Sequence, residues 1–364
     1  SSEVLNALFY LYASGDPGLE LAEGVLSGNV ASGIFSGLEL VDGTSLQLLA
    51  PPYVMKRMDL DPAGSAEIDL AIAARSGITN SKAWYAANRP YAGCSVVIGF
   101  GLNGNGQITT PSGLADAIQV AAGWRHSLAL TSGGTVVGWG QNNNGQTTIP
   151  TDLSGVTAIA AGAYFNLALK RNGTVIGWGQ NNNGQTTLPA GLTNVTAVAA
   201  GLNFGLALKN DGTVVGWGTE SSVPAGLSNV TAIAANLYHC LALKSDGTVT
   251  AWGSNSNGQT NAPAGLSNVT AVAAGLYHSL ALKSDGTVVG WGRSDSGEIN
   301  TTGLSNVTAI AAATYFSLAL KSDGTVVGWG NNSNGQIAIP AGLSNVTAIA
   351  AGGSHSLVLK PKTE

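Results

Sequence analysis

The chain has 364 residues, of which 51 are glycine and only 10% are charged. Because 44% of the residues are apolar and the net charge is −5, this composition excludes an intrinsically disordered chain. The acidic excess lies in residues 1–93, with ten acidic and five basic side chains, whereas residues 94–364 carry ten of each. A neutral surface offers phosphates no electrostatic attraction, so nucleic acid is not an expected partner. No apolar run reaches membrane-spanning length.

Residues 1–93 lack the pattern of the rest of the chain and are expected to form a small mixed region. Residues 18–50 predict short strands separated by Gly and Ser. The apolar spacing within residues 66–75 predicts a helix, and residues 81–88 predict a second, shorter one. We interpret residues 1–93 as an anchoring or assembly region, with a subdomain of no function of its own as the alternative.

A unit marked by Gly-Trp-Gly repeats along the remainder of the chain. Its tryptophans are Trp139, Trp178, Trp217, Trp252, Trp291 and Trp329, and Phe100 holds the same place in the first copy. Successive tryptophans lie 39, 39, 35, 39 and 38 residues apart. The short interval has lost the loop Asn-Asn-Asn-Gly-Gln and keeps the rest. Repetition at this period indicates a propeller or a solenoid.

Each unit predicts three strands in succession. Val-Thr-Ala-Ile-Ala-Ala is the first, His-Ser-Leu-Ala-Leu-Lys the second and Thr-Val-Val-Gly-Trp-Gly the third. Asp-Gly between the second and third predicts a hairpin turn, since Gly adopts a positive φ without strain. The segment Asn-Gly-Gln-Thr-Thr-x-Pro then predicts a loop and a short outer edge strand, where Pro is tolerated.

The two ends of the repeat array are complementary fragments of one unit. Residues 94–111 contain the third strand and its loop, and residues 346–360 contain the first two strands. A solenoid would need capping repeats instead. Pairing of the fragments would close a ring and remove its open sheet edges. We therefore predict an all-β, seven-bladed propeller over residues 94–364. Cys94 and Cys240 fall on opposite sides of this ring, so no disulfide is expected between them.

The unit Gly-x-x-His-Ser-Leu-Ala-Leu-x-x-Asp-Gly-x-Val-x-x-Trp-Gly-x-Asn-x-x-Gly-Gln resembles the repeat of the regulator of chromosome condensation family. The resemblance covers about three quarters of the chain and is strongest to bacterial members such as β-lactamase inhibitory protein II. The family includes a guanine nucleotide exchange factor, inhibitors, receptors and surface proteins. The resemblance therefore implies the fold and leaves the function open.

Aromatic residues recur at the turn between the first and second strands, and equivalent turns of a propeller face the same mouth. The pairs at this turn are Trp124-Arg125, Tyr164-Phe165, Asn203-Phe204, Tyr238-His239, Tyr277-His278, Tyr315-Phe316 and Ser354-His355. Trp, Tyr and Arg are common interface anchors. The resemblance to the lactamase inhibitor implies partner contacts here, so we predict a binding site made of Trp124, Arg125, Tyr164, Tyr238, Tyr277 and Tyr315. The alternative is that these rings pack between neighbouring blades.

The other candidate sites have simpler structural interpretations. His126, His239, His278 and His355 share one repeat position with Phe residues. This favours buried rings whose nitrogen bonds to the backbone over catalytic or metal-binding groups. His278 and Ser279 are adjacent in a strand and point to opposite faces, so they cannot form a nucleophile–base pair. The amide-rich loops could bind glycans, although Asn and Gly are ordinary turn residues. We expect no catalytic residue, no metal and no cofactor.

Three functions remain open at this point. We favour a non-enzymatic recognition or structural protein that displays the propeller on a cell surface or a phage particle through residues 1–93. Its partner would be a protein, with a glycan as the alternative, and its location would be extracellular, at the cell surface or on a virion. The alternatives are a soluble enzyme inhibitor and, less favoured, an exchange-factor-type regulator. The lack of a convergent acid, base or metal constellation counts against an enzyme.

Overall fold

The computed structural model describes residues 95–219 and 222–362, together with the backbone of six short strands before residue 93. The chain divides into two compact units, Ser1–Arg75 with Ala83–Asn88 and Ser76–Lys82 with Arg89–Glu364.

The described strands of the first unit form three two-stranded sheets. They are β1 (Tyr12–Ala13), β2 (Asp16–Glu20), β3 (Ser27–Asn29), β4 (Ile34–Ser36), β5 (Val54–Lys56) and β6 (Asp69–Ala71), paired as β1–β2, β3–β4 and β5–β6. The helix predicted over residues 66–75 is wrong at its centre, where β6 pairs with β5. Ile68, Leu70 and Ile72 recur every second residue, which is the period of a strand. The second predicted helix, over residues 81–88, lies outside the described residues.

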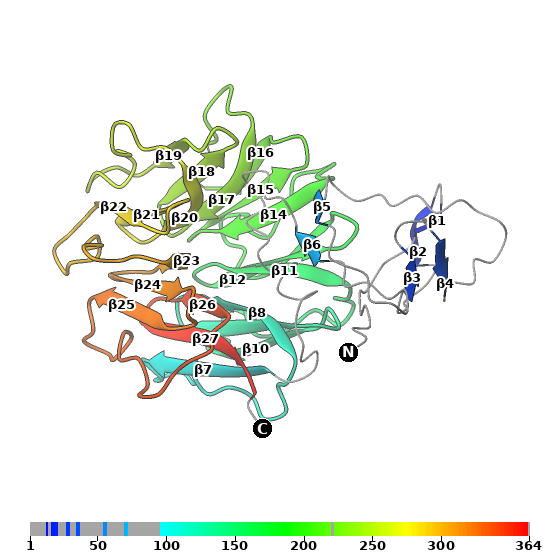
Figure 1. Ribbon diagram of the computed structural model, residues 1–364, viewed down its shortest axis with the longest axis horizontal. Helices are drawn as coiled ribbons and strands as arrows, with labels where there is room; N and C mark the ends of the chain where they lie inside the picture. Colours follow the sequence, from blue (N-terminus) through cyan, green and yellow to red (C-terminus); the bar gives the residue numbers. More distant parts are fainter. Residues whose placement is uncertain are drawn as a thin grey trace. The chain divides into compact units, whose positions relative to one another are not determined.

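Seven three-stranded antiparallel sheets form the blades of a propeller (Figure 1). The first strands of the blades are β8 (Ala117–Ala122), β11 (Val156–Ala161), β14 (Val195–Ala200), β17 (Val230–Ala235), β20 (Val269–Ala274), β23 (Val307–Ala312) and β26 (Ala348–Ala351). The second strands are β9 (His126–Thr131), β12 (Phe165–Lys170), β15 (Phe204–Lys209), β18 (His239–Lys244), β21 (His278–Lys283), β24 (Phe316–Lys321) and β27 (His355–Pro361). The third strands are β10 (Val136–Gly140), β13 (Val175–Gly179), β16 (Val214–Gly218), β19 (Val249–Gly253), β22 (Val288–Gly292), β25 (Val326–Gly330) and β7 (Ser95–Gly101).

The three predicted strands and the Asp-Gly hairpin recur in the blades. In the blade of β20 to β22, Gly286 has a φ of 77°, and its N–H donates to the carbonyl of Lys283. The outer edge strand predicted after the third strand is absent from the described part of the propeller, where turns follow instead. Side-chain amides hold these turns, and a loop fixed in this way does not present a straight edge for pairing.

Ring closure occurs between the two ends of the repeat array. Strand β27 pairs antiparallel with β7 along its whole length, from His355 opposite Gly101 to Pro361 opposite Ser95. The completed blade is bonded to the next one, because the Ser95 hydroxyl donates to the carbonyl of Ala117 at 2.6 Å. The prediction of a closed seven-bladed propeller is therefore confirmed.

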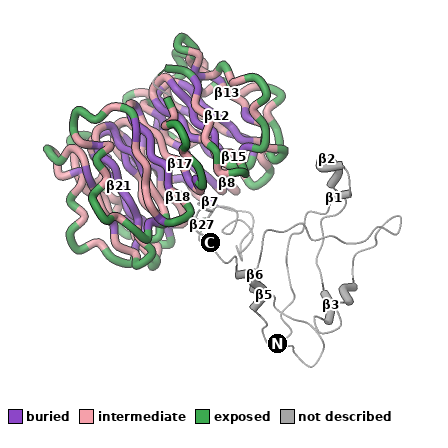
Figure 2. The backbone as a smooth tube through the Cα atoms, turned by 90° about the horizontal axis from the view of Figure 1, so that it is seen from above, coloured by how far each residue is buried: buried purple, intermediate pink, exposed green. Residues whose placement is uncertain are grey.

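The apolar core lies between the blades. Seven clusters of buried residues each combine side chains from two neighbouring blades. At one interface, for example, Leu128 and Leu130 of β9 pack with Val156 and Ile159 of β11 and with Trp178 of β13. Figure 2 shows the consequence, with buried strands inside and exposed loops at their ends. Because the strands are held on both faces, the turns at their ends have fixed positions.

Candidate protein-binding face

The turns between first and second strands all present one residue to the same end of the propeller. Its carbonyl accepts a hydrogen bond from the N–H that follows the third strand of the same blade, as Tyr277 does from Arg293 at 2.9 Å. The seven residues that accept this bond are Arg125, Tyr164, Asn203, Tyr238, Tyr277, Tyr315 and Ser354. Arg125, and not Trp124, is therefore equivalent to the tyrosines, which corrects the pairing inferred from the sequence.

Trp124 belongs to an inner circle of residues near the propeller axis. Its backbone N–H donates to the carbonyl of Ala163 in the next blade at 3.3 Å, and a similar bond joins Leu276 to Ala313 at 2.9 Å. Trp124 and Ala163 also line a narrow axial hollow of about 120 Å³, together with the small residues at the ends of the first strands. Small residues at these strand ends are required because all seven blades approach each other there.

The predicted aromatic residues gather in one cluster. Ala163, Leu237 and Leu276 are buried at its centre, and the half-buried rings of Trp124, Tyr164, Tyr238, Tyr277 and Tyr315 pack against them. Arg125 is exposed. Each ring therefore has one side packed against the propeller and one side open to a partner. Packing between blades and partner binding, the two interpretations drawn from the sequence, thus apply to different sides of the same rings.

Three tyrosines of successive blades form a continuous stack that Arg293 covers. The ring centroids of Tyr238 and Tyr277 lie 6.2 Å apart with an interplanar angle of 25°, and those of Tyr277 and Tyr315 lie 6.2 Å apart at 38°. The guanidinium carbon of Arg293 lies 5.0 Å from the centroid of Tyr315 and 5.6 Å from that of Tyr277. Cation–π contacts of this kind hold an arginine flat on aromatic rings. We call Tyr238, Tyr277, Tyr315 and Arg293 the tyrosine face.

Two carboxylates position Arg293. Its Nε donates to Asp295 at 2.8 Å and lies 4.0 Å from Glu298 Oε1. Glu298 is fully buried and replaces the Gln found at the same loop position in other units. Arg293 stands directly after Gly-Trp-Gly, where no other unit has a basic residue, and this difference between units is the signal by which sequence analysis could have found it.

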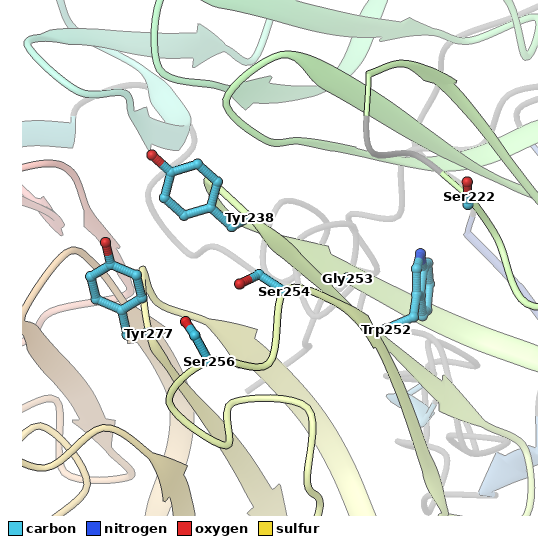
Figure 3. Close-up of a pocket in the computed structure, with 7 residues that line it drawn as sticks. All are labelled: Ser222, Tyr238, Trp252, Gly253, Ser254, Ser256 and Tyr277. Atoms are coloured by element: carbon cyan, nitrogen blue, oxygen red, sulfur yellow. The ribbon is translucent and has the colours of Figure 1, made fainter.

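A hollow of about 590 Å³ opens beside the tyrosine face (Figure 3). Its described lining residues are Ser222, Tyr238, Trp252, Gly253, Ser254, Ser256 and Tyr277. It lies where the unit between Trp217 and Trp252 has lost its loop. The sequence analysis noted this loss and did not associate it with a site.

The four histidines of the repeat are fully buried and bridge neighbouring blades. In each, Nε2 contacts a side chain of the next blade: His126 with Asn166 at 2.7 Å, His239 with Ser279 at 2.8 Å, His278 with Ser317 at 2.9 Å and His355 with Ser127 at 3.0 Å. The sequence analysis expected bonds to the backbone, and the partners are side chains instead. Where the next blade has Gly205 or Cys240, the unit has Phe165 or Phe204 in place of His.

Burial makes these histidines poor acid–base groups. It lowers the pKa of His126 and His239 to about 4, and that of His278 and His355 to about 3. The hydrogen bond that the His126 Nε2–H donates to Asn166 Oδ1 opposes the lowering of the His126 pKa. Repulsion from a neighbouring histidine adds to the lowering for His278 and His355. His239 and Ser279 do form a His–Ser pair across blades, but both are fully buried, so a substrate could not reach them.

The loop amides that suggested glycan binding are largely occupied in holding their own loops. Asn142 Oδ1 accepts from the N–H of Thr147, Asn142 Nδ2 donates to Thr148, and Gln146 Oε1 accepts from the N–H of Asn144. Among residues 95–219 and 222–362, no three His, Cys, Asp or Glu side chains cluster as metal ligands. Within the same ranges no helix is suited to crossing a membrane. Cys240 is buried and unpaired, and Cys94 lies outside the described residues.

Comparisons with known proteins place the fold. The family model "Regulator of chromosome condensation (RCC1) repeat" matches residues 117–146, 156–185, 195–222, 230–259, 269–298 and 307–336. No curated protein sequence matches the chain.

Several solved structures are similar in fold. They include Prp20p from Saccharomyces cerevisiae, with a TM-score of 0.65 and 19% identity over 78% of this chain and 95% of that one. Human WBSCR16 has a TM-score of 0.60 and 18% identity over 73% of this chain and 100% of that one. The ectodomain of the Physcomitrella patens receptor kinase CR4 has a TM-score of 0.56 and 21% identity over 64% and 67% of the two chains. With six matched repeats and a seventh blade of the same form at the closure, the chain is a regulator of chromosome condensation (RCC1) repeat β-propeller.

Proposed function

We propose that the chain is a non-enzymatic recognition protein that binds a partner protein through the tyrosine face. The observation that carries the proposal is the stack of Tyr238, Tyr277 and Tyr315 with Arg293 across two of the rings. Rigid aromatic rings held on one side lose little side-chain entropy on binding, and Tyr and Arg dominate binding energy at protein interfaces.

Similar proteins support a protein partner over other ligands. Prp20p has been characterised with its binding to Gsp1p and histones, and a second structure shows yeast RCC1 bound to Kap60. The neutral net charge of residues 94–364 favours a partner held by packing and hydrogen bonds. A glycan partner has less support, because the loop amides are already bonded within the chain.

Residues 1–93 are proposed to anchor or assemble the protein, displaying the propeller on a cell surface or a particle. The propeller closes through β7 and β27, and therefore needs no strand from residues 1–93 for its ring. Light scattering after size exclusion should show self-association in the full chain and a monomer when residues 1–93 are removed. A monomer in both cases would leave the tyrosine face proposal standing and remove the assembly role. An inhibitor or an exchange-type regulator would use the same face and differ in its partner.

The binding proposal is tested by site-specific photocrosslinking in lysate of the source organism. A crosslinker in place of the exposed Ser294, next to Arg293, should capture one protein, whereas a crosslinker at Ser284, in an exposed turn at the opposite ends of the strands, should not. Tyr315→Ala, introduced beside the crosslinker, should reduce capture without changing the circular dichroism spectrum. Equal capture from both positions would overturn the proposal.

A further inference from the structure

The hollow beside Trp252 occupies a place that the chain itself fills at other blade interfaces. The interval from Trp217 to Trp252 is 35 residues, and the intervals on either side are 39. The four missing residues come from the loop that elsewhere reads Asn-Asn-Asn-Gly-Gln. The neighbouring repeats therefore show what kind of molecule fits this space.

In the intact interfaces, the last residue of that loop supplies a carbonyl to the next blade. The indole Nε1 of the following tryptophan donates to it: Trp139 to Gln107 at 2.9 Å, Trp178 to Gln146 at 3.1 Å, Trp217 to Gln185 at 2.9 Å, Trp291 to Gln259 at 2.9 Å and Trp329 to Glu298 at 2.6 Å. A side chain of the second strand donates to the same carbonyl, as Ser279 does to Gln259 at 2.8 Å.

Trp252 lacks this acceptor. It is 8% exposed, and its indole N–H is buried without a hydrogen-bond partner. In Figure 3 the indole nitrogen lies on the edge of the ring nearest Ser222. A buried donor without a partner loses about 1–3 kcal/mol relative to a bonded one, so an acceptor supplied from outside would recover that free energy.

The lining specifies the chemistry of the occupant. Its described residues combine the Trp252, Tyr238 and Tyr277 rings with the hydroxyl groups of Ser222, Ser254 and Ser256. Such a site favours a group that carries both hydrogen-bond acceptors and donors beside apolar surface. A peptide backbone with amide side chains, which fills the equivalent place in the other interfaces, has this character.

We propose that the hollow binds an Asn- and Gly-containing turn of a partner protein, with a backbone carbonyl of the turn accepting from Trp252 Nε1. This inference rests on the proposed function, since Tyr238 and Tyr277 belong to both the hollow and the tyrosine face. The partner's turn takes the place of the loop that this unit has lost. The rings of the tyrosine face then hold the partner surface on either side of the turn.

The test uses the full chain with ¹⁵N-labelled tryptophan and a cyclic peptide of residues 179–187, the loop that serves Trp217. The indole resonance of Trp252 is assigned from its loss in Trp252→Phe. Titration with the peptide should move this resonance downfield, as a new hydrogen bond requires, while the resonance of Trp291 stays in place. Binding to Trp252→Phe should be on the order of tenfold weaker, the equivalent of one hydrogen bond, and binding to Trp291→Phe should be unchanged.

A second variant fills the hollow with the chain's own sequence. Replacing residues 219–222 by residues 180–187 restores the 39-residue interval and should abolish peptide binding. The proposal is overturned if the peptide binds this variant or Trp252→Phe as well as it binds the unchanged protein, if it does not bind at millimolar concentration, or if methyl glucoside moves the Trp252 resonance and the peptide does not.

The two proposals fail in different ways. If the filled variant still captures the partner through the crosslinker at Ser294 and only Tyr315→Ala abolishes capture, the turn site is wrong and the tyrosine face stands. If the peptide binds at Trp252 but no partner is captured from Ser294, the tyrosine face is wrong and the turn site stands.

Discussion

The interface before Trp291 and the interface before Trp252 are built from nearly the same sequence, yet only the first is closed by its loop. At Trp291, the carbonyl of Gln259 accepts from the indole and from Ser279. At Trp252 the loop is four residues shorter, and Cys240 stands where the other unit has Ser279. The interface before Trp252 has thus lost both the hydroxyl donor of the second strand and the carbonyl acceptor of the loop. The indole N–H of Trp252 is the donor that remains.

This difference shows how a repeat protein gains a specific site. A buried thiol tolerates the loss of an acceptor better than a hydroxyl, because it is a weak donor and behaves as a small apolar group. Phe204, which faces Cys240 from the previous blade, replaces the histidine that would need a partner there. The interface remains packed while one donor, Trp252 Nε1, is left for a ligand.

Acidification should have the largest effect on the free energy of unfolding. The effect should arise at the blade interfaces that a histidine bridges. The folded pKa values of His126, His239, His278 and His355 lie at about 3 to 4, below the ordinary value of 6.5. The unfolded chain therefore binds more protons in this range, and stability falls as pH drops from 7 to 4.5, by roughly 2 kcal/mol per histidine. Urea unfolding at the two pH values measures the loss.

The Phe204–Cys240 interface, which has no histidine, suggests a control for this pH dependence. Replacing all four histidines by Phe, as in the Phe204–Cys240 interface, should remove most of this pH dependence, and His239→Phe alone about a quarter of it. An unchanged slope in the fourfold variant would show that other groups titrate on unfolding.

Shortening the loop before Trp291 should have the next largest effect on the free energy of unfolding. Replacing residues 254–261 by the sequence of residues 219–222 leaves the Trp291 indole and Ser279 without their acceptor. Two buried donors at about 1–3 kcal/mol each predict a loss of about 2–6 kcal/mol in the free energy of unfolding. Adding Ser279→Cys and His239→Phe, which copies the natural short interface, should recover part of it. No recovery in urea unfolding would mean that the substitutions at the natural site are unrelated to its short loop.

The smallest effect is expected from single tryptophan substitutions. Trp291→Phe removes a hydrogen bond of 2.9 Å, whereas Trp252→Phe removes none within the chain. Both lose similar packing, so Trp291→Phe should cost about 1 kcal/mol more, by the net value of one hydrogen bond. Equal shifts of the urea midpoint would indicate that the indole of Trp252 is already satisfied in solution.

Much of the propeller could be predicted because each of its strands and turns depends on local signals that recur from unit to unit. The Asp-Gly hairpin, the alternating Leu residues of β21 and the complementary ends each have a direct counterpart in the structure. The outer strand after Gln259 and the helix over residues 66–75 were wrong, because the loop amides bond within their own turn and because the apolar spacing also fits a strand. The site was only partly predictable: the tyrosines were found by repetition, but Trp124 was placed one position out of register.

The sequence by itself determined the seven units, their strands and the closure of the ring. The reason is that turn residues and apolar alternation are local signals, and they recur in successive units. Only the tertiary structure decided which side chains meet between blades. Arg293 covers the ring of Tyr315, and His239 contacts Ser279, across 22 and 40 residues of chain. Such contacts depend on how neighbouring sheets pack. Whether a donor such as Trp252 Nε1 finds an acceptor is likewise a property of two blades together.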